Sequence, residues 1–408
     1  MKTGSVFLLA TMDTKAKVTR FFRRELEQYG LRVILIDMGI LKKSPADVDI
    51  PQSELLGVFQ EEVRNTKTRA EAFTLMSQGL FRVVSDLYKR GELAAAVSLG
   101  GSGGTALASL AMRTLPLGVP KVIVSTMASG NTLPYVCGED ILLINPVVDI
   151  QNLNFLTCNT LRRAAGIVAA MLTFPLEQKE TKGAIAISGF GVTTPCVDAC
   201  VNMLEQEGYE VLVFHARGIS GGRIMEKMID EGHFVGVLDL TTSEIADEIG
   251  GGIYAVGPQR LSTATRLGIP YVVTAGALEM INLGSEEMLT EAQKRRVLYQ
   301  HSPSSVKMRA NAEELRACAR LFIERLSQSK GNVVVLVANK GFSMVNKEGQ
   351  VFYAPKSDAA FIRELEEFMP SSVPVRILNM HQNDIEFAQA CVQTLLTLMA
   401  GKENRSYR

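Results

Sequence analysis

The stretch AVSLGGSGGTALASLAM, residues 96–112, decides the fold class and the first functional hypothesis. An apolar run ends at Gly100. The glycines that follow are interrupted by Ser102 and end before Thr105, and a helical run of small residues comes next. This order predicts a strand, a glycine-rich turn and the start of a helix. Glycines let backbone N–H groups approach a ligand, and a helix N-terminus carries unpaired donors with partial positive charge. The pattern therefore predicts a phosphate or carboxylate site, although a tight turn without a ligand would have a similar sequence.

The spacing of this turn differs from two known phosphate-binding motifs. A Walker A loop has Lys and then Ser or Thr after its last glycine, whereas Thr105 follows Gly104 directly. A dinucleotide fingerprint needs G-x-G-x-x-G, and Gly101 and Gly103 supply only its first half. The sequence thus indicates an anion site of neither type.

Length and composition indicate a chain of two or three domains. The chain has 408 residues, 47% of them hydrophobic, which is enough to bury substantial cores. Its 43 basic and 43 acidic residues balance, so the charge pattern of a general nucleic-acid binder is absent. The sequence contains no run of about 20 apolar residues, so we expect no membrane span. Six scattered cysteines are typical of reduced thiols in a cytoplasmic protein.

Strand-like and helix-like segments alternate along the whole chain. This alternation predicts an α/β fold with two Rossmann-like, doubly wound domains and mainly parallel sheets. The polar stretch LEQKETKG, residues 176–183, is the expected linker between an N-terminal domain (1–177) and a C-terminal domain (183–408). We expect strands at 5–10, 94–99, 141–144, 184–188, 235–240, 271–274 and 375–378 and a helix at 308–327. In such sheets, ligands bind at the carboxyl ends of the strands.

Three other loops in the first half follow predicted strands and would meet the glycine turn. Asp13 comes after the first strand, where it could cap the next helix or contact magnesium or a hydroxyl group, with Lys15 as a phosphate counter-charge. Asp37 ends the second strand, the usual place of a ribose-binding acid, and a cap or turn role explains it equally well. The segment STMASGN, residues 125–131, predicts a second set of donors for phosphates.

Four side chains near strand ends in the second half are candidates for binding or acid–base chemistry: His215, Asp239, Glu244 and His381. The chain has only four histidines, so two at strand ends suggest proton transfer. Each of the four could equally be a packed or capping residue. No Ser/His/Asp order or metal spacing links them, so no reaction follows from them. Segments 250–252 and 276–282 are expected to be flexible loops beside the cleft.

Long ordered motifs cover nearly the whole chain: ATMDTK, LGGSGGT, PKVIVSTMASGN, NPVVDI, GFGVTTPCV, VFHARGISGG, VLDLTTSEIADEIGGG, GALEMINLG and HQNDIEFA. With these motifs the chain resembles the family of the tomato mosaic virus resistance protein's N-terminal ATP-binding region and its uncharacterised bacterial relatives. The resemblance implies two Rossmann-like domains, with ATP and Mg²⁺ in the first. The nucleotide contacts that it implies are Thr11, Asp13, Gly101, Ser102, Gly103, Gly104, Thr105, Thr126, Ser129 and Gly130. One departure is Arg163, where relatives tend to have Asn, and this difference puts a contact from that helix start in doubt.

These observations predict an ATP-binding cytoplasmic protein and leave open what ATP is used for. One hypothesis is an ATP-dependent enzyme that acts on a small polar metabolite held between the domains. The alternative is a non-catalytic interaction or regulatory protein, resembling the plant antiviral inhibitor of viral RNA replication, and the missing Walker lysine favours it. An NAD-dependent oxidoreductase is weaker, because the dinucleotide fingerprint is incomplete. We also expect a homo-oligomer, such as a homodimer, no general binding of nucleic acids and no binding of membranes.

Overall fold

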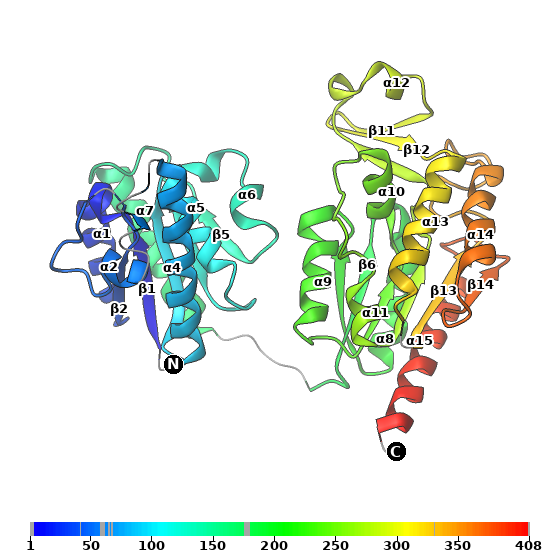
Figure 1. Cartoon of the computed structure of the whole chain (residues 1–408), viewed down its shortest axis with the longest axis horizontal. Helices are drawn as coiled ribbons and strands as arrows, with labels where there is room; N and C mark the ends of the chain where they lie inside the picture. Colours follow the sequence, from blue (N-terminus) through cyan, green and yellow to red (C-terminus); the bar gives the residue numbers. More distant parts are fainter. Residues whose placement is uncertain are drawn as a thin grey trace. The chain divides into compact units, whose positions relative to one another are not determined.

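The structure, a computed structural model, describes residues 4–40, 42–57, 62–63, 66, 68–174, 180–329 and 331–406. The chain divides into two compact units, Met1–Gln178 and Lys179–Arg408. Residues 176–179 of the expected linker lie outside the described residues. Each unit is an α/β structure built on a parallel sheet, as the sequence predicts (Figure 1). All six cysteines are free thiols.

The first unit contains one five-stranded sheet in the order β2-β1-β3-β4-β5, and every neighbouring pair is parallel. Its strands are β1 (Ser5–Ala10), β2 (Val33–Asp37), β3 (Leu93–Gly100), β4 (Lys121–Ser125) and β5 (Ile141–Ile144). Its helices are α1 (Met12–Glu27), α2 (Gln52–Leu56), α4 (Arg69–Lys89), α5 (Ser102–Met112), α6 (Leu133–Val136) and α7 (Phe155–Thr173), with a short 3-10 turn, η2 (Thr126–Ser129).

Helices cover both faces of this sheet. Successive residues of a strand point to opposite sides, so each strand contributes side chains to the two cores beneath these helices. In β1, Phe7 and Leu9 pack in the core that contains Met76 of α4 and Leu107 of α5. Val6 and Leu8 face the other core, with residues of α1 and α7. Both faces are therefore apolar, which is why the strands read as nearly continuous hydrophobic runs.

The second unit repeats this architecture with a six-stranded parallel sheet in the order β14-β13-β9-β8-β6-β7. Its strands are β6 (Ala184–Gly189), β7 (Glu210–His215), β8 (Gly236–Asp239), β9 (Tyr271–Thr274), β13 (Val333–Ala338) and β14 (Val375–Leu378). Its helices are α8 (Thr194–Gln206), α9 (Gly222–Asp230), α10 (Ser243–Gly250), α11 (Thr263–Leu267), α12 (Glu291–Lys294), α13 (Ala312–Leu326), α14 (Pro355–Phe368) and α15 (Ile385–Ser406). Three 3-10 turns are η3 (Gly191–Thr193), η4 (Gly218–Ser220) and η5 (Glu286–Met288).

A small antiparallel sheet between β9 and β13 is the main departure from the predicted order. It consists of β10 (Met280–Leu283), β11 (Leu298–Ser302) and β12 (Ser305–Arg309), and Figure 1 shows β11, β12 and α12 together at one end of the unit. The predicted helix at 308–327 is wrong at its start, since Met308 belongs to β12. Asn311 forms a capping box with Glu314, so α13 begins only at Ala312. The predicted loop at 276–282 is likewise wrong where β10 begins at Met280.

Among the described helices, none combines the length and the apolar character that crossing a membrane requires.

Candidate functional site

A cavity of about 370 Å³ lies at the carboxyl ends of β1, β2 and β3 in the first unit. The strand order reverses between β1 and β3, and the helices that follow these two strands pack on opposite faces of the sheet. Doubly wound sheets bind their ligands in this kind of crevice. The lining includes Thr11, Asp13 and Lys15 after β1, and the four residues from Gly101 to Gly104 after β3. The structure thus brings two of the predicted loops together.

The N-terminus of α5 presents backbone donors to this cavity. The N-cap residue is Gly101, whose backbone is extended and which has no side chain to cap the helix. Within the described part of the chain, the N–H groups of Ser102, Gly103 and Gly104 have no hydrogen-bond partner, and the first bond is from Thr105 N to Gly101 O at 2.9 Å. No acidic residue occupies the first turn. The positive end of the helix is therefore available to an anion.

Thr105, a predicted nucleotide contact, stabilises the glycine turn through hydrogen bonds of its buried side chain. Its Oγ1 lies 2.7 Å from the carbonyl oxygen of Gly101 and 2.6 Å from Oγ of Ser125 at the end of β4. The side chain is fully buried and does not line the cavity. In this structure Thr105 fixes the glycine turn to the neighbouring strand.

Asp37 has the turn role that the sequence left open beside ribose binding. Its Oδ1 accepts hydrogen bonds from the backbone N–H of Met12 at 3.0 Å and of Gly39 at 2.8 Å. Its Oδ2 accepts a hydrogen bond from Ser44 Oγ at 2.7 Å, and the side chain is fully buried. These three bonds hold the segments after β1 and β2 in place, so Asp37 supports the cavity without facing it.

Charged side chains of both signs stand at the cavity. Lys15 Nζ lies 3.5 Å from Oδ1 of Asp149, whose side chain is 61% exposed. The lysine side chain is only 14% exposed, but the distance is long and the aspartate is exposed, so this ion pair contributes little and its lysine can turn to another anion at the cavity. Asp13 accepts a hydrogen bond from the backbone N–H of Ile40 at 3.2 Å. Asp13 therefore links the loops after β1 and β2 while lining the cavity.

Beyond the contact of Ser125 with Thr105, the loop after β4 also approaches the glycine turn at Thr126. A Cβ atom at Gly101 would lie 3.9 Å from Oγ1 of Thr126. Ser129 Oγ donates a hydrogen bond to the carbonyl oxygen of Thr126 at 3.1 Å. Of the described residues 126–130, including Gly130, none lines the cavity. The predicted second set of donors thus lies outside the cavity lining, although Thr126 approaches Gly101.

Asp239 and Glu244, two of the four candidates in the second unit, are fully buried in an ionic network. Arg260, also fully buried, pairs with both carboxylates, and its Nε lies 2.6 Å from Glu244 Oε2. Burial raises the pKa of Glu244, against the opposing effect of Arg260. Neither carboxylate is among the described residues that line the second unit's cavities of about 470 and 520 Å³. This placement supports a structural role in joining β8 to α10.

The two histidines differ in accessibility. His381 is buried, with Nε2 at 3.0 Å from the carbonyl oxygen of Ser343, and its Nδ1 accepts a hydrogen bond from the backbone N–H of Asn383. Burial also lowers the His381 pKa. His215, at the end of β7, keeps much of its surface exposed and lines a separate cavity, where partial burial and the neighbouring Arg217 lower its pKa. The structure therefore does not bring the four candidates into one site.

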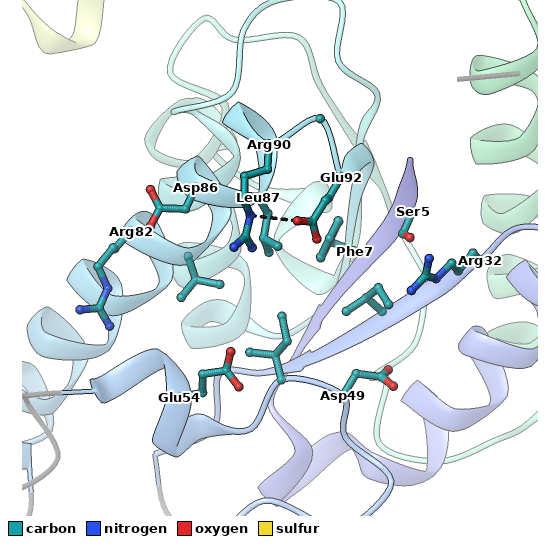
Figure 2. Close-up of a pocket in the computed structure, with 14 residues that line it drawn as sticks. Ser5, Phe7, Arg32, Asp49, Glu54, Arg82, Asp86, Leu87, Arg90 and Glu92 are labelled. Carbon is teal, nitrogen blue, oxygen red and sulfur yellow. Dashed lines mark ion pairs between the residues drawn. The ribbon is translucent and has the colours of Figure 1, made fainter. Parts of the chain in front are cut away.

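A further cavity, of about 560 Å³, lies at the other end of the first sheet, away from the carboxyl ends of its strands. Figure 2 shows charged side chains of both signs around it, including the ion pair of Arg90 with Glu92, which is 2.9 Å long. Its lining includes Ser5, the first residue of β1, and Arg32 just before β2. The amino ends of the strands lie here, where doubly wound sheets do not usually bind ligands. The cavity between β1 and β3 remains the better candidate.

Comparison with known proteins assigns both units. The N-terminal domain of the uncharacterised protein family UPF0261 matches residues 4–177, and the C-terminal domain of the same family matches residues 182–399. The chain belongs to this family.

Three relatives illustrate how far the similarity extends. A UPF0261 protein of Clostridium tetani is 40% identical over 97% of this chain and 98% of its own length. A UPF0261 protein of Rhizobium meliloti is 37% identical over 95% of this chain and 97% of its own. The tomato mosaic virus resistance protein Tm-1 of Solanum lycopersicum is 35% identical over 96% of this chain and 55% of its own. The family that the motifs indicated is thus confirmed.

Among solved structures, UDP-N-acetylglucosamine 2-epimerase matches 67% of this chain and 79% of its own, with 10% identity and a TM-score of 0.23. A likeness this weak carries no argument about function.

Proposed function

We propose that the first unit binds ATP in the cavity between β1 and β3, with the triphosphate against the N-terminus of α5. The observation that carries this proposal is the set of unpaired N–H groups at Ser102, Gly103 and Gly104 beside that cavity. Its volume of about 370 Å³ falls within the usual range of small-molecule sites, about 300–1,000 Å³. The family resemblance implies the same ligand.

The donor set suits a phosphate group energetically. A hydrogen bond from a backbone N–H to a charged group contributes about 1.5–3 kcal/mol, and a partly buried helix N-terminus adds up to about 2 kcal/mol. Three such bonds, with Lys15 turning from Asp149 to the anion, can supply the roughly 8 kcal/mol of micromolar binding. In a turn that binds no ligand, these N–H groups would form hydrogen bonds only with water.

Magnesium fits this site only together with the nucleotide. Among the described residues, no group of three or more His, Cys, Asp or Glu side chains could hold a metal ion. Mg²⁺ is commonly held by phosphate oxygens with one or two carboxylates, rather than by an all-protein cage. Asp13 and Asp149 line the cavity and are the carboxylates that would complete such a set, where the ion would neutralise phosphate charge.

Two functions are compatible with ATP binding: a binding or regulatory protein, and an ATP-dependent enzyme. The burial of Asp239 and Glu244 removes two candidate acid–base groups from solvent and favours a binding or regulatory protein. A cationic cavity around His215 in the second unit favours an ATP-dependent enzyme with a small polar substrate. Steady release of phosphate from ATP, stimulated by a metabolite, would decide for the enzyme. A cytoplasmic location and assembly as a homodimer stay predictions from the sequence.

A pair of variants at Ser102 tests the phosphate site. Ser102 is the first residue of α5 and follows an extended Gly101, so proline fits there and removes one N–H donor. Ser102→Ala keeps that N–H and removes only the hydroxyl group. We expect calorimetric titration to show ATP binding about tenfold or more weaker in Ser102→Pro, and within about threefold of the parent in Ser102→Ala.

Two results would contradict the proposal. The first is equal ATP affinity in Ser102→Pro and the parent protein, with circular dichroism showing that both are folded. The second is a parent protein that binds adenosine as tightly as ATP, since the triphosphate would then contribute nothing. Titration with NAD in parallel tests the oxidoreductase alternative.

A further inference from the structure

The second unit has its own cavity of about 470 Å³, away from the buried network of Arg260. It lies where the segments after β6 and β7 meet the small antiparallel sheet, and residues from Phe190 to Val192 form one wall. The six-stranded parallel sheet reverses its strand order between β6 and β8, and this cavity lies on the other side of β6, next to β7. Among its lining residues, the sequence alone points only to His215.

The cavity has a positive lining. Arg217, His215, His301 and Lys307 line it, and none of the described lining residues is Asp or Glu. Arg217 has no ion pair in the part of the chain that the structure describes, and its guanidinium lies 5.1 Å from the ring centre of Tyr254. A charged group held against an aromatic ring, without a carboxylate partner, remains able to bind an anion.

Lys307 is the most unusual member of this lining, because its residue is only 3% exposed. Its Nζ lies 4.7 Å from the ring centre of Phe190 and 5.7 Å from that of Tyr254. The same ammonium group donates a hydrogen bond to the amide oxygen of Asn282. A buried ammonium normally requires a carboxylate partner, and here two rings and one neutral oxygen take that place.

Asp247, the carboxylate that acts electrostatically on Lys307, does not line the cavity. Asp247 accepts hydrogen bonds from the backbone and side chain of Asn282, and from the backbone N–H of Tyr254 at 3.2 Å. The amide of Asn282 thus stands between Asp247 and Lys307. Burial lowers the pKa of Lys307 to about 8 and raises that of Asp247 to about 7. The lysine is therefore mostly charged at neutral pH, and its charge is only partly balanced.

We propose that this cavity binds a small organic anion, in which a carboxylate or phosphate group meets Lys307 and Arg217. The planar or apolar part of the ligand would lie against Phe190, Tyr254 and Tyr299, which line the same cavity. Hydroxyl groups of the serines at 302, 304 and 305 supply further donors for the acid group. This site is independent of the ATP site in the first unit, and neither proposal depends on the other.

Calorimetric titration of the full chain with three matched probes tests this site. Phenyl phosphate and benzoate carry the two acid groups on one ring, and phenol carries neither. The titrations use the parent chain, and the Arg217 variant below distinguishes binding at this cavity from phosphate binding at α5. We expect at least one acid to bind with a dissociation constant below about 1 mM, and phenol to bind at least about tenfold more weakly. The acid that binds more tightly identifies the ligand class.

Two variants locate the binding. Arg217→Gln removes an exposed cation of the lining, whereas Arg223→Gln removes an exposed cation of α9 outside it. We expect about tenfold weaker binding in Arg217→Gln and no more than about twofold change in Arg223→Gln. Lys307→Met should abolish binding, with its fold checked by circular dichroism.

The proposal is overturned if neither acid binds at about 10 mM, or if phenol binds as tightly as both acids. It is also overturned if Arg217→Gln and Arg223→Gln bind the acid equally well.

Discussion

Replacing Arg260 by methionine is expected to destabilise the second unit strongly. Its guanidinium pairs with Asp239 and Glu244, and it lies 3.6 Å from Glu226. All three carboxylates are buried, and the substitution leaves Asp239 and Glu244 without the cation that pairs with them. Removing one partner of a buried ion pair costs about 3–5 kcal/mol. We therefore expect the free energy of unfolding to fall by about that amount.

The hydrogen-bond donors that remain around Asp239 and Glu244 limit the loss of unfolding free energy to about 3–5 kcal/mol. Asp239 still accepts hydrogen bonds from Ser188 Oγ at 2.5 Å and from Tyr271 OH at 2.7 Å. Glu244 still accepts two from the backbone N–H groups of Gly218 and Gly222, at 2.7 and 3.1 Å. These bonds were formed around an arginine, so they compensate for the lost charge only in part.

Hydrogen exchange followed by mass spectrometry is the suitable assay, because the chain has two units and one denaturation midpoint would mix them. Peptides from β8 should exchange much faster in Arg260→Met, whereas peptides from β1 should not change. The matched control is Arg266→Met, whose ion pair with Asp230 has both side chains more than half exposed. That change should cost less than about 1 kcal/mol.

Equal protection of β8 in Arg260→Met and in Arg266→Met would refute the stabilising role of the buried arginine. A variant of Arg260→Met that also carries Asp239→Asn and Glu244→Gln should recover part of the lost protection, because the abandoned charges are then absent. If those added substitutions make β8 exchange still faster, charge burial is not the cause.

Three other predictions concern particular residues. Gly341 has φ +126°, and a Cβ there would overlap the carbonyl oxygen of Asn346, so Gly341→Ala should lose about 3 kcal/mol or more of stability, measured by hydrogen exchange of peptides from the second unit. Gly349→Ala, at φ +82° with nothing within 4 Å, should lose about 1–2 kcal/mol, and equal losses would contradict the steric explanation. Thr105→Val should lose about 1 kcal/mol of stability and leave ATP affinity within about threefold, whereas a tenfold loss of affinity would make Thr105 a ligand contact. Burial raises the pKa of Glu226 and of Glu279 to about 7, so their folded forms hold protons that the unfolded chain releases near its ordinary value of 4.5. Their contribution to stability is present below about pH 4.5 and lost as the pH rises to about 7. Hydrogen exchange of peptides from the second unit, corrected for the intrinsic pH dependence of exchange, should show a smaller fall in stability over that window in Glu279→Gln than in the parent.

The parallel sheets could be predicted from the sequence because their strands are buried on both faces. Four predicted strands, at 5–10, 141–144, 271–274 and 375–378, agree with the observed bounds. Continuous apolar runs between polar loops give a strong local signal of this kind. The alternation with helices then restricts the fold to doubly wound units.

The small antiparallel sheet could not be predicted in the same way. Its strands are short, and Lys307 and Arg309 alternate with apolar neighbours that also fit the start of a helix. The true start of α13 is marked locally by the capping box of Asn311 with Glu314. That box separates residues 305–309 from the helix, and it is the signal from which a strand there could have been predicted.

The roles of the acidic residues depend on partners distant in sequence. Asp239 and Glu244 are buried because Arg260, in an irregular segment, reaches both of them. No local pattern indicates that pairing. Asp37 likewise is bound by Ser44, in a loop whose path follows from tertiary packing. The glycine turn was predictable because its donors depend only on the local strand–turn–helix order.

The most direct test of ATP binding at α5 is a crystal structure of the full chain grown with ATP and magnesium. We expect phosphate oxygens at about 2.7–3.1 Å from the backbone nitrogens of Ser102 and Gly103, with Lys15 turned toward them. ATP bound elsewhere on the chain, with those nitrogens bonded only to water, would contradict the proposed site.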